Sequence, residues 1–163
     1  MIKEDLQRIK LKMQEEGIIT NNPISINDIT NFENRYKFIL PEELSLFYTE
    51  IGNGCEMIDG FYLKRLEELE FDETKIREDF IFTRYWIWED DKNKALLDKV
   101  GNGNISLIDI GDCQSWNIIV TGEERGRMWF FTDVGIQPCV PNRGFLSWFE
   151  YWLDGNENYF GEF

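Results

Sequence analysis

The N-terminal part of the chain carries apolar residues at a helical spacing. Ile2, Leu6, Ile9 and Met13 recur every three or four positions, which places all of them on one face of a helix. Gly17 follows two glutamates and is typical of the left-handed residue that ends a helix. The pattern therefore predicts an amphipathic first helix that ends near residue 17.

Two more helices are predicted before residue 55. Ser25 followed by Asp28 is a variant of the capping box, so a second helix should begin there and continue through Tyr36. Pro41 suits the first position of a third helix, because that position does not need a backbone N–H. Gly52 helps to end this helix. Its buried face is expected to consist of Leu44, Phe47, Tyr48 and Ile51.

The last third of the chain changes to a strand pattern. Segments 105–110, 116–121 and 127–132 are rich in apolar residues and are separated by glycine-containing turns, which predicts an antiparallel meander. Residues 136–140 are expected to add a short strand. Apolar residues stand at both odd and even positions of 105–110. Both faces of the sheet are therefore expected to be covered by other apolar parts of the chain. A broadly apolar helix over 145–153 should pack against this meander.

The middle of the chain is harder to assign. A short strand is expected at 61–63 and one helical turn at 66–69, followed by a short helix at 92–100. Two aromatic runs, 80–82 and 85–88, have the composition of strands. The whole chain of 163 residues has the length of one domain. We therefore expect a single α+β domain over 1–163, with N-terminal helices, a central antiparallel-rich sheet and a closing helix.

The charge of the molecule is concentrated in this middle part. The chain has a net charge of −14, and residues 67–91 contain ten acidic residues against Lys75, Arg77 and Arg84. Half of the net negative charge therefore lies in this stretch. Such a balance argues against binding to nucleic acid, which needs a basic surface, and against attraction to anionic membranes. It favours a basic protein partner.

Composition also excludes several kinds of chemistry. The chain contains no histidine, so no Ser-His-Asp triad, histidine base or histidine-ligated metal is possible. Its three cysteines, Cys55, Cys113 and Cys139, are widely separated and are expected to be reduced, buried thiols without a bound metal. The charged N-terminus lacks the apolar core of a signal peptide, so a cytoplasmic location is expected.

Three short motifs imitate ligand sites without completing them. Gly101-Asn102-Gly103 lacks the third glycine of a phosphate-binding loop. Asp154, Asn156 and Asn158 copy the start of a calcium loop, but the chain ends before its bidentate glutamate. Asp109 and Asp112 alone are not a metal site. We therefore expect no cofactor, no metal and no catalytic residue. Carboxylates alone can catalyse glycoside hydrolysis, which leaves such an enzyme as an alternative, but 31 acidic residues offer too many pairs to single one out.

The aromatic residues beside the acidic run have two interpretations. Trp86 and Trp88 are two positions apart, so in a strand they share one face. That face either belongs to the core or forms a binding surface rimmed by Glu89, Asp90 and Asp91, since tryptophan is enriched in binding hot spots. An alternative role for the acidic run is solubility alone. Trp148 and Trp152 on the last helix are expected in the core.

Several short motifs follow one another along the chain: Ile29-x-x-Phe32-Glu33, Leu40-Pro41-Glu42-Glu43, Leu46-Phe47-Tyr48, Asn53-Gly54, Ile105 to Gly111, Trp116 to Gly122, Gly126 to Phe131, and Phe145 to Leu153. Their order resembles the SUKH superfamily, which includes a yeast cell-wall-assembly regulator and many bacterial immunity proteins. The resemblance covers about residues 26 to 153. It departs from the family in the turn after residue 110 and in the acidic insert from about 70 to 100.

The resemblance implies a protein that binds rather than catalyses. Bacterial members neutralise polymorphic toxins, many of them nucleases, so a cognate toxin with a basic cleft is the partner we expect. A regulatory or scaffold module of the same fold is the alternative. The expected partner-binding residues lie in the acidic and aromatic stretch and in one later turn: Glu70, Asp72, Glu73, Glu78, Asp79, Trp86, Trp88, Glu89, Asp90, Asp91, Glu123 and Glu124.

Overall fold

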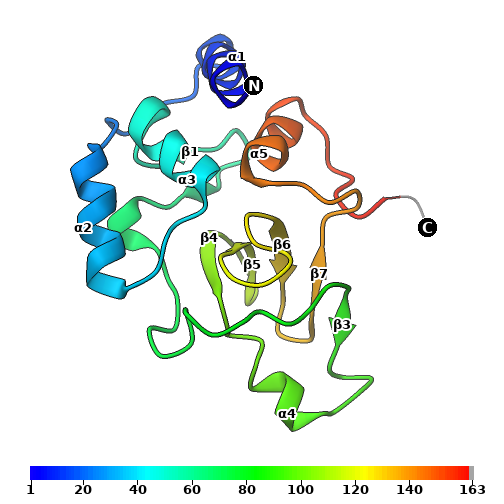
Figure 1. Ribbon diagram of the computed structural model, residues 1–163. Helices are drawn as coiled ribbons and strands as arrows, with labels where there is room; N and C mark the ends of the chain where they lie inside the picture. Colours follow the sequence, from blue (N-terminus) through cyan, green and yellow to red (C-terminus); the bar gives the residue numbers. More distant parts are fainter. Residues whose placement is uncertain (162–163) are drawn as a thin grey trace.

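The computed structural model describes residues 1–161 (Figure 1). Along the chain, helices come before and after the main strands of a central sheet. Its helical elements are α1 (Ile2–Glu15), α2 (Ile26–Tyr36), α3 (Glu42–Leu46), a π-helical turn η1 (Phe47–Ile51), a 3₁₀ turn η2 (Leu66–Glu68), α4 (Lys94–Leu97) and α5 (Phe145–Leu153). The strands are β1 (Cys55–Glu56), β2 (Tyr62–Leu63), β3 (Trp86–Ile87), β4 (Asn104–Gly111), β5 (Gln114–Ile119), β6 (Met128–Phe131) and β7 (Gly135–Pro138). The expected α+β class is confirmed.

The N-terminal helices begin and end where the sequence indicates. Gly17, with a φ of 68°, follows α1 in the left-handed region that a side chain disfavours. At the start of α2 the Asp28 amide donates to Ser25 Oγ at 3.1 Å, and the Ser25 amide donates to Asp28 Oδ2 at 3.0 Å. This reciprocal pair is the expected capping box. Pro41 precedes α3 as its N-cap rather than occupying its first turn.

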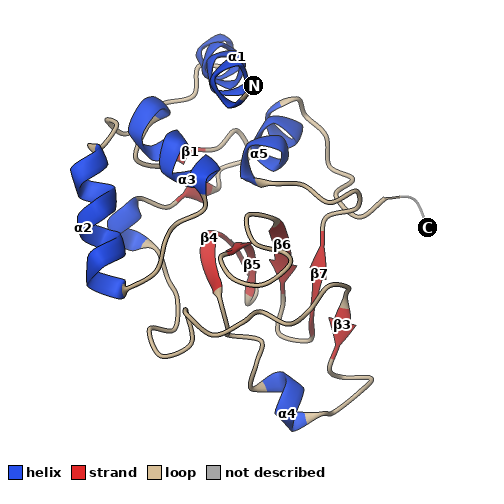
Figure 2. Ribbon diagram, viewed as in Figure 1, coloured by secondary structure: helices blue, strands red, loops and turns tan. Residues whose placement is uncertain are grey.

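The central sheet has five strands in the order β3-β7-β6-β5-β4, all antiparallel (Figure 2). Strands β4, β5, β6 and β7 pair consecutively, with Ile105 opposite Ile118 and Trp116 opposite Phe130. The expected meander is therefore confirmed. Strands β1 and β2 form a separate two-stranded hairpin, which lies in the chain between the N-terminal helices and the strands of the central sheet.

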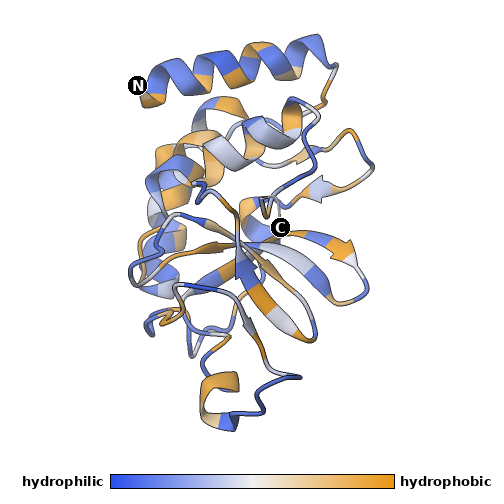
Figure 3. Cartoon of the chain, turned by 90° about the vertical axis from the view of Figure 1, so that its right-hand side faces the viewer, coloured by the Kyte–Doolittle hydropathy of each residue, from blue (hydrophilic) through white to orange (hydrophobic). Residues whose placement is uncertain are grey.

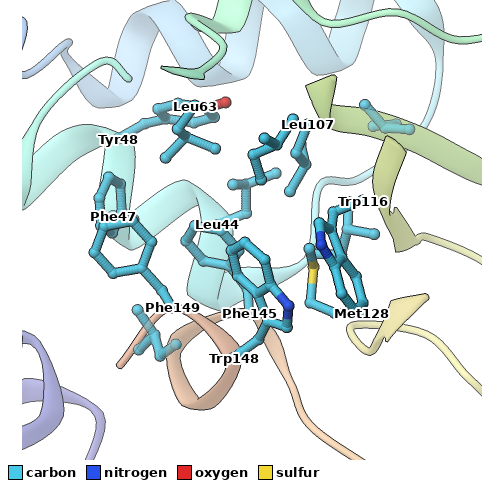
Figure 4. Packing of buried hydrophobic residues seen from close by; sticks show 14 of the residues in the cluster. Leu44, Phe47, Tyr48, Leu63, Leu107, Trp116, Met128, Phe145, Trp148 and Phe149 are labelled. Atoms are coloured by element: carbon cyan, nitrogen blue, oxygen red, sulfur yellow. The ribbon is translucent and has the colours of Figure 1, made fainter. Parts of the chain in front are cut away.

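Both faces of the sheet are covered by apolar residues, as expected from β4. One face packs against α5, where Trp116 lies 5.3 Å from Trp148 between ring centroids. Trp148 and Trp152 are both buried, so their expected place in the core is confirmed. Figure 4 shows how residues from α3, η1, β2, the sheet and α5 meet in this larger core: Leu44, Phe47, Tyr48, Leu63, Leu107, Trp116, Met128, Phe145, Trp148 and Phe149.

The opposite face carries a second, smaller core. Its buried members are Phe80, Phe82, Ile119, Trp129, Phe131 and Ile136. The expectation of a strand at 80–82 was wrong, because Phe80 and Phe82 enter this core from an irregular segment that crosses the sheet. The Phe80 amide is satisfied by Thr121 Oγ1 at 2.9 Å. A Cβ atom at Gly122, whose φ is 76°, would clash with the Phe80 carbonyl oxygen. The apolar pattern there indicated burial, not strand pairing.

Two other expected elements are shorter than the sequence suggested. Only Trp86 and Ile87 of the run 85–88 pair in a strand, opposite Ile136 and Gly135 of β7. The helix expected over 92–100 is reduced to α4, which starts after Asn93 because the Asn93 side chain accepts from the Ala95 and Leu96 amides. Figures 1 and 3 place α4 at the end of the molecule opposite α1.

Candidate protein-binding surface

The acidic stretch 70–91 wraps the α4 end of the molecule and is fixed there by buried apolar residues. Ile76 and Phe80 are almost completely buried, and Phe82 is buried beside them. Carboxylates occupy positions between and around these anchors. The segment therefore has a fixed path that presents its acidic side chains to solvent.

Most of the predicted acidic residues have no basic partner within the chain. Residues Asp72, Glu73, Glu78, Asp79, Glu89, Asp90 and Asp91 are exposed, and none forms an ion pair within residues 1–161. The Thr74 hydroxyl and amide donate to Asp72 Oδ1 at 2.6 and 2.9 Å, and these bonds lower the pKa of Asp72. The surface is thus a concentration of uncompensated negative charge at neutral pH.

The charge is not uniform along the stretch. Lys92, Lys94 and Lys99 follow Glu89–Asp91 in the chain and are exposed beside α4, so they offset the local potential there. Around Asp72–Asp79, Lys75 donates to the Asp98 carbonyl at 2.7 Å and Arg77 to the Tyr36 carbonyl at 2.9 Å. Both cations are therefore held by backbone oxygens and leave the carboxylates of 72–79 unpaired.

Glu70 differs from the other predicted carboxylates of 70–91 because it has a basic partner. Lys64, which is 7% exposed, lies 3.6 Å from Glu70 and 3.2 Å from Asp109, and donates to Ser106 Oγ at 3.1 Å. Such pairing satisfies a largely buried ammonium group, which is costly to leave alone. Glu70 and Asp109 thus neutralise the charge of Lys64 at the edge strand β4.

Trp86 and Trp88 do share a face, but that face looks toward the second core. Both are half-buried; the Trp86 ring stacks on Phe82 with centroids 5.6 Å apart, and Trp88 Nε1 donates to the Asp133 carbonyl at 2.9 Å. The neighbouring side chains of Tyr85 and Ile87 are the exposed ones. They lie beside Phe130 on the other face of the sheet, where the sequence analysis placed no binding residue.

Glu123 and Glu124 do not form a pair on the surface. Glu123 is exposed as expected, but Glu124 is only 4% exposed. Its carboxylate lies 2.6 Å from Arg127 Nη1 and accepts from Trp129 Nε1 at 3.2 Å. Glu124 is therefore removed from the predicted surface, since its oxygens satisfy a buried indole and an arginine.

An aromatic pocket lies outside the surface that the sequence predicted. It has a volume of about 240 Å³ and opens between the β1–β2 hairpin, the ends of β4 and β5, α5 and the C-terminal segment. The residues that line it are Met57, Asp59, Phe61, Ile108, Ile110, Trp116, Phe130, Trp148, Trp152, Tyr159 and Phe160. We call it the Asp59 pocket. Its residues come from six separate parts of the chain, including Phe130 of β6, so no local motif could have indicated it.

The Asp59 pocket and β3 share one face of the sheet. Phe130 lines the pocket and also a smaller hollow of about 170 Å³ that includes Tyr85, Ile87 and Gln137. Exposed aromatic and apolar surface thus continues from the pocket to β3. Large aromatic residues on such a surface are typical of protein-binding sites.

The cysteines and the rejected ligand motifs have ordinary surroundings. Cys55 and Cys139 are buried free thiols, and burial raises the pKa of each to about 12. Cys113 is free but exposed, so the expectation that all three are buried was wrong. In the part of the chain that the structure describes, no three acidic or cysteine side chains converge as metal ligands would. Asp154 of the calcium-like motif pairs with Lys12 at 2.7 Å.

None of the helices within residues 1–161 is both long and apolar enough to cross a membrane. No protein-family model matches this chain, and no curated protein matches its sequence. The function must therefore be inferred from the residues of the chain and their arrangement.

Proposed function

We propose that this protein is a non-catalytic immunity protein of the SUKH type, which binds a cognate toxin and blocks it. The observation that carries the proposal is the set of exposed, unpaired carboxylates of 72–91 in a chain with a net charge of −14. The motif order that resembles the superfamily supports it, as does the arrangement of N-terminal helices, antiparallel sheet and closing helix. A cytoplasmic nuclease with a basic substrate cleft is the toxin that fits this charge best.

The proposed mechanism is occlusion. Carboxylates at Asp72, Glu73, Glu78 and Asp79 take the place of substrate phosphates in the basic cleft of the toxin. Complementary charge accelerates association, to about 10⁸ M⁻¹s⁻¹ or faster in well-steered complexes. Such speed suits a protein that must capture a toxin before it causes damage. Apolar and aromatic contacts then slow dissociation, because buried anchors contribute more affinity than charges at the rim.

The proposal is tested with the product of the neighbouring gene. Co-purification of the two proteins and loss of the toxin's activity in the complex are expected. A quadruple variant, Asp72→Asn, Glu73→Gln, Glu78→Gln and Asp79→Asn, should then slow association about tenfold at low ionic strength and much less at high salt. Stopped-flow or surface-binding kinetics at two salt concentrations measure both effects.

A matched control separates this surface from net charge alone. Glu15, Glu16, Glu50 and Glu56 are exposed and lie outside the acidic stretch, so their replacement by Gln changes the net charge equally. The control variant should associate nearly as fast as the wild-type protein. Equal slowing by both variants would reject the acidic stretch as the binding surface. A neighbouring gene product that is a regulatory protein, with no toxin activity to block, would replace the immunity proposal with a regulatory module.

A further inference from the structure

The Asp59 pocket combines aromatic walls with a single charged group. Trp116 and Phe160 stack with ring centroids 5.8 Å apart and an angle of 11° between their planes, while Trp148 and Tyr159 stack at 5.9 Å and 25°. The side chains of Met57, Ile108 and Ile110 complete the apolar wall of the pocket. Asp59 is the one ionisable carboxyl among the lining residues, and no lysine or arginine is among them.

The Asp59 carboxylate is held in a fixed orientation. Its Oδ2 accepts from Trp152 Nε1 at 3.0 Å, and its Oδ1 accepts from the Phe61 amide at 3.4 Å. A carboxylate has about four acceptor positions, so each oxygen keeps capacity for a further donor. Within residues 1–161 this carboxylate forms no ion pair. The pocket therefore offers an oriented anion without a counter-charge.

The electrostatic surroundings of the pocket are negative. Burial raises the pKa of Tyr159 above its usual range, and the negative charges of Asp59 and Glu157 raise this pKa further. Tyr159 therefore stays neutral and presents an aromatic ring to the pocket. The carboxylates of Asp59 and Glu157 lie close enough to make the electrostatic potential there negative. Both the negative charge and the aromatic faces attract a cation.

We propose that the Asp59 pocket binds an arginine side chain of the partner protein. A planar guanidinium group stacks on aromatic rings and donates a pair of hydrogen bonds to a carboxylate. A water molecule occupies about 30 Å³ in the liquid, so the pocket of about 240 Å³ has room for about eight waters, which is enough space for the side chain of one arginine. The chain itself uses this geometry outside the pocket, where the Arg143 guanidinium lies 3.9 Å from the Tyr151 ring centroid.

Other occupants fit the pocket less well. An apolar side chain would cover Asp59 without giving a donor in return, which leaves a desolvated charge unpaired. A lysine ammonium is more strongly hydrated and lacks the planar fork that both stacks and pairs. The net charge of −14 favours a basic partner in general. Arginine is therefore the occupant that satisfies the walls and the carboxylate together.

This inference rests on the proposed function, because the arginine belongs to the bound partner, but its test does not need that partner. The probe is the tripeptide Gly-Arg-Gly with blocked ends, added to the full-length ¹⁵N-labelled protein at millimolar concentration. Saturable shifts are expected for the indole N–H signals of Trp116, Trp148 and Trp152. The peptide in which citrulline replaces arginine keeps the shape without the charge, and it should bind at least about tenfold more weakly.

Two variants locate the effect. Asp59→Asn keeps an acceptor for the Trp152 indole and removes the charge, so it should fold normally and weaken the arginine peptide about tenfold. Asp133→Asn is the control, because Asp133 is exposed and does not line the pocket. Equal shifts with arginine, citrulline and leucine peptides would show a merely apolar pocket and overturn the proposal. So would dimerisation of the wild-type protein that Phe61→Ala abolishes, since a second copy would then occupy the site.

The outcomes separate this inference from the proposed function. If the neighbouring gene product binds but Asp59→Asn leaves its dissociation rate unchanged, and the peptide does not bind, only the arginine pocket is rejected. If the arginine peptide binds as expected but no toxin is captured, the pocket stands and the immunity proposal fails. If the arginine pocket and the immunity proposal are both correct, Asp59→Asn should raise the dissociation rate of the toxin complex about tenfold and leave its association rate largely unchanged.

Discussion

Arg8 and Glu150, which are 142 residues apart in the chain, form a two-pronged ion pair that joins α1 to α5. Arg8 Nε donates to Glu150 Oε2 and Arg8 Nη2 to Oε1, each at 2.7 Å. Lys12 Nζ lies 2.8 Å from Glu150 Oε2 and 2.7 Å from Asp154 Oδ1. A bidentate pair within a larger network has the geometry that isolated surface pairs lack. The N-terminal helix is thus attached to the closing helix by charge as well as by its apolar face.

This network predicts a pH-dependent stability. The hydrogen bonds from Arg8 are the main cause that lowers the pKa of Glu150 to about 2, from an ordinary value of 4.5. Because the folded-state pKa is lowered, the stabilisation is complete above about pH 4.5 and is lost as the pH falls toward 2. Glu150→Gln should lower the melting temperature by a few degrees at pH 7. The difference from the wild-type protein should shrink between pH 4.5 and pH 2.

Thermal unfolding followed by circular dichroism at several pH values measures this effect. Glu157→Gln is the matched control, because Glu157 is exposed and forms no ion pair within residues 1–161. It should change the melting temperature little at any pH. A Glu150→Gln deficit that stays constant down to pH 2 would contradict the role of this carboxylate.

Glu123 and Glu124 are neighbours whose replacement should affect stability to very different extents. Glu124→Ala leaves the buried Trp129 indole without its acceptor, and a buried donor without a partner costs about 2 kcal/mol. Glu123→Ala changes an exposed side chain and should alter the free energy of unfolding by less than about 0.5 kcal/mol. Urea unfolding of both variants gives the comparison. Equal destabilisation would mean that the Glu124 carboxylate does not satisfy Trp129.

The sequence predicted the backbone of this fold better than its surface. The stripe of Leu6, Ile9 and Met13, the Ser25 cap and the strand pattern after residue 104 each depend on neighbours in the chain. Local periodicity and capping chemistry reveal such features directly. The strand predicted at 80–82 is absent because apolar residues in a row indicate burial, whereas strand pairing depends on a distant partner.

The candidate site shows the same division between local and distant information. Exposure of the acids in 72–91 follows from their local density of charge, but the burial of Glu124 depends on Trp129 and Arg127 folding over it. The Asp59 pocket combines residues 57–61 with 159–160, about a hundred positions apart. Nothing in the sequence near Asp59 indicates the tryptophan that orients its carboxylate.

The three cysteines should differ in reactivity. Cys113 is exposed at the β4–β5 turn, whereas burial holds the thiols of Cys55 and Cys139 largely protonated and inaccessible. A thiol reagent at neutral pH should therefore modify one cysteine in the folded protein and three after denaturation without reductant. Mass spectrometry of the labelled peptides identifies the sites. Rapid labelling of Cys139 in the folded protein would contradict its burial, and fewer than three labels after denaturation would indicate a disulfide.

Trp86 and Tyr85 allow the roles of the aromatic run in folding and in binding to be separated. Trp86 stacks on Phe82 and is half-buried against the second core, so Trp86→Ala should cost about 2 kcal/mol of stability. Tyr85 is 64% exposed, and Tyr85→Ala should cost less than about 0.5 kcal/mol. Urea unfolding of the two variants measures this difference.

Affinity for the partner should show the opposite order. Tyr85 lies on the exposed face that continues into the Asp59 pocket, so Tyr85→Ala should weaken binding of the partner by about 1 kcal/mol, or about fivefold. Trp86→Phe keeps an aromatic ring against Phe82 and should leave this affinity nearly unchanged. Calorimetric titration of the folded variants gives both values. A large loss of affinity in Trp86→Phe with none in Tyr85→Ala would move the binding surface to the opposite face of the sheet.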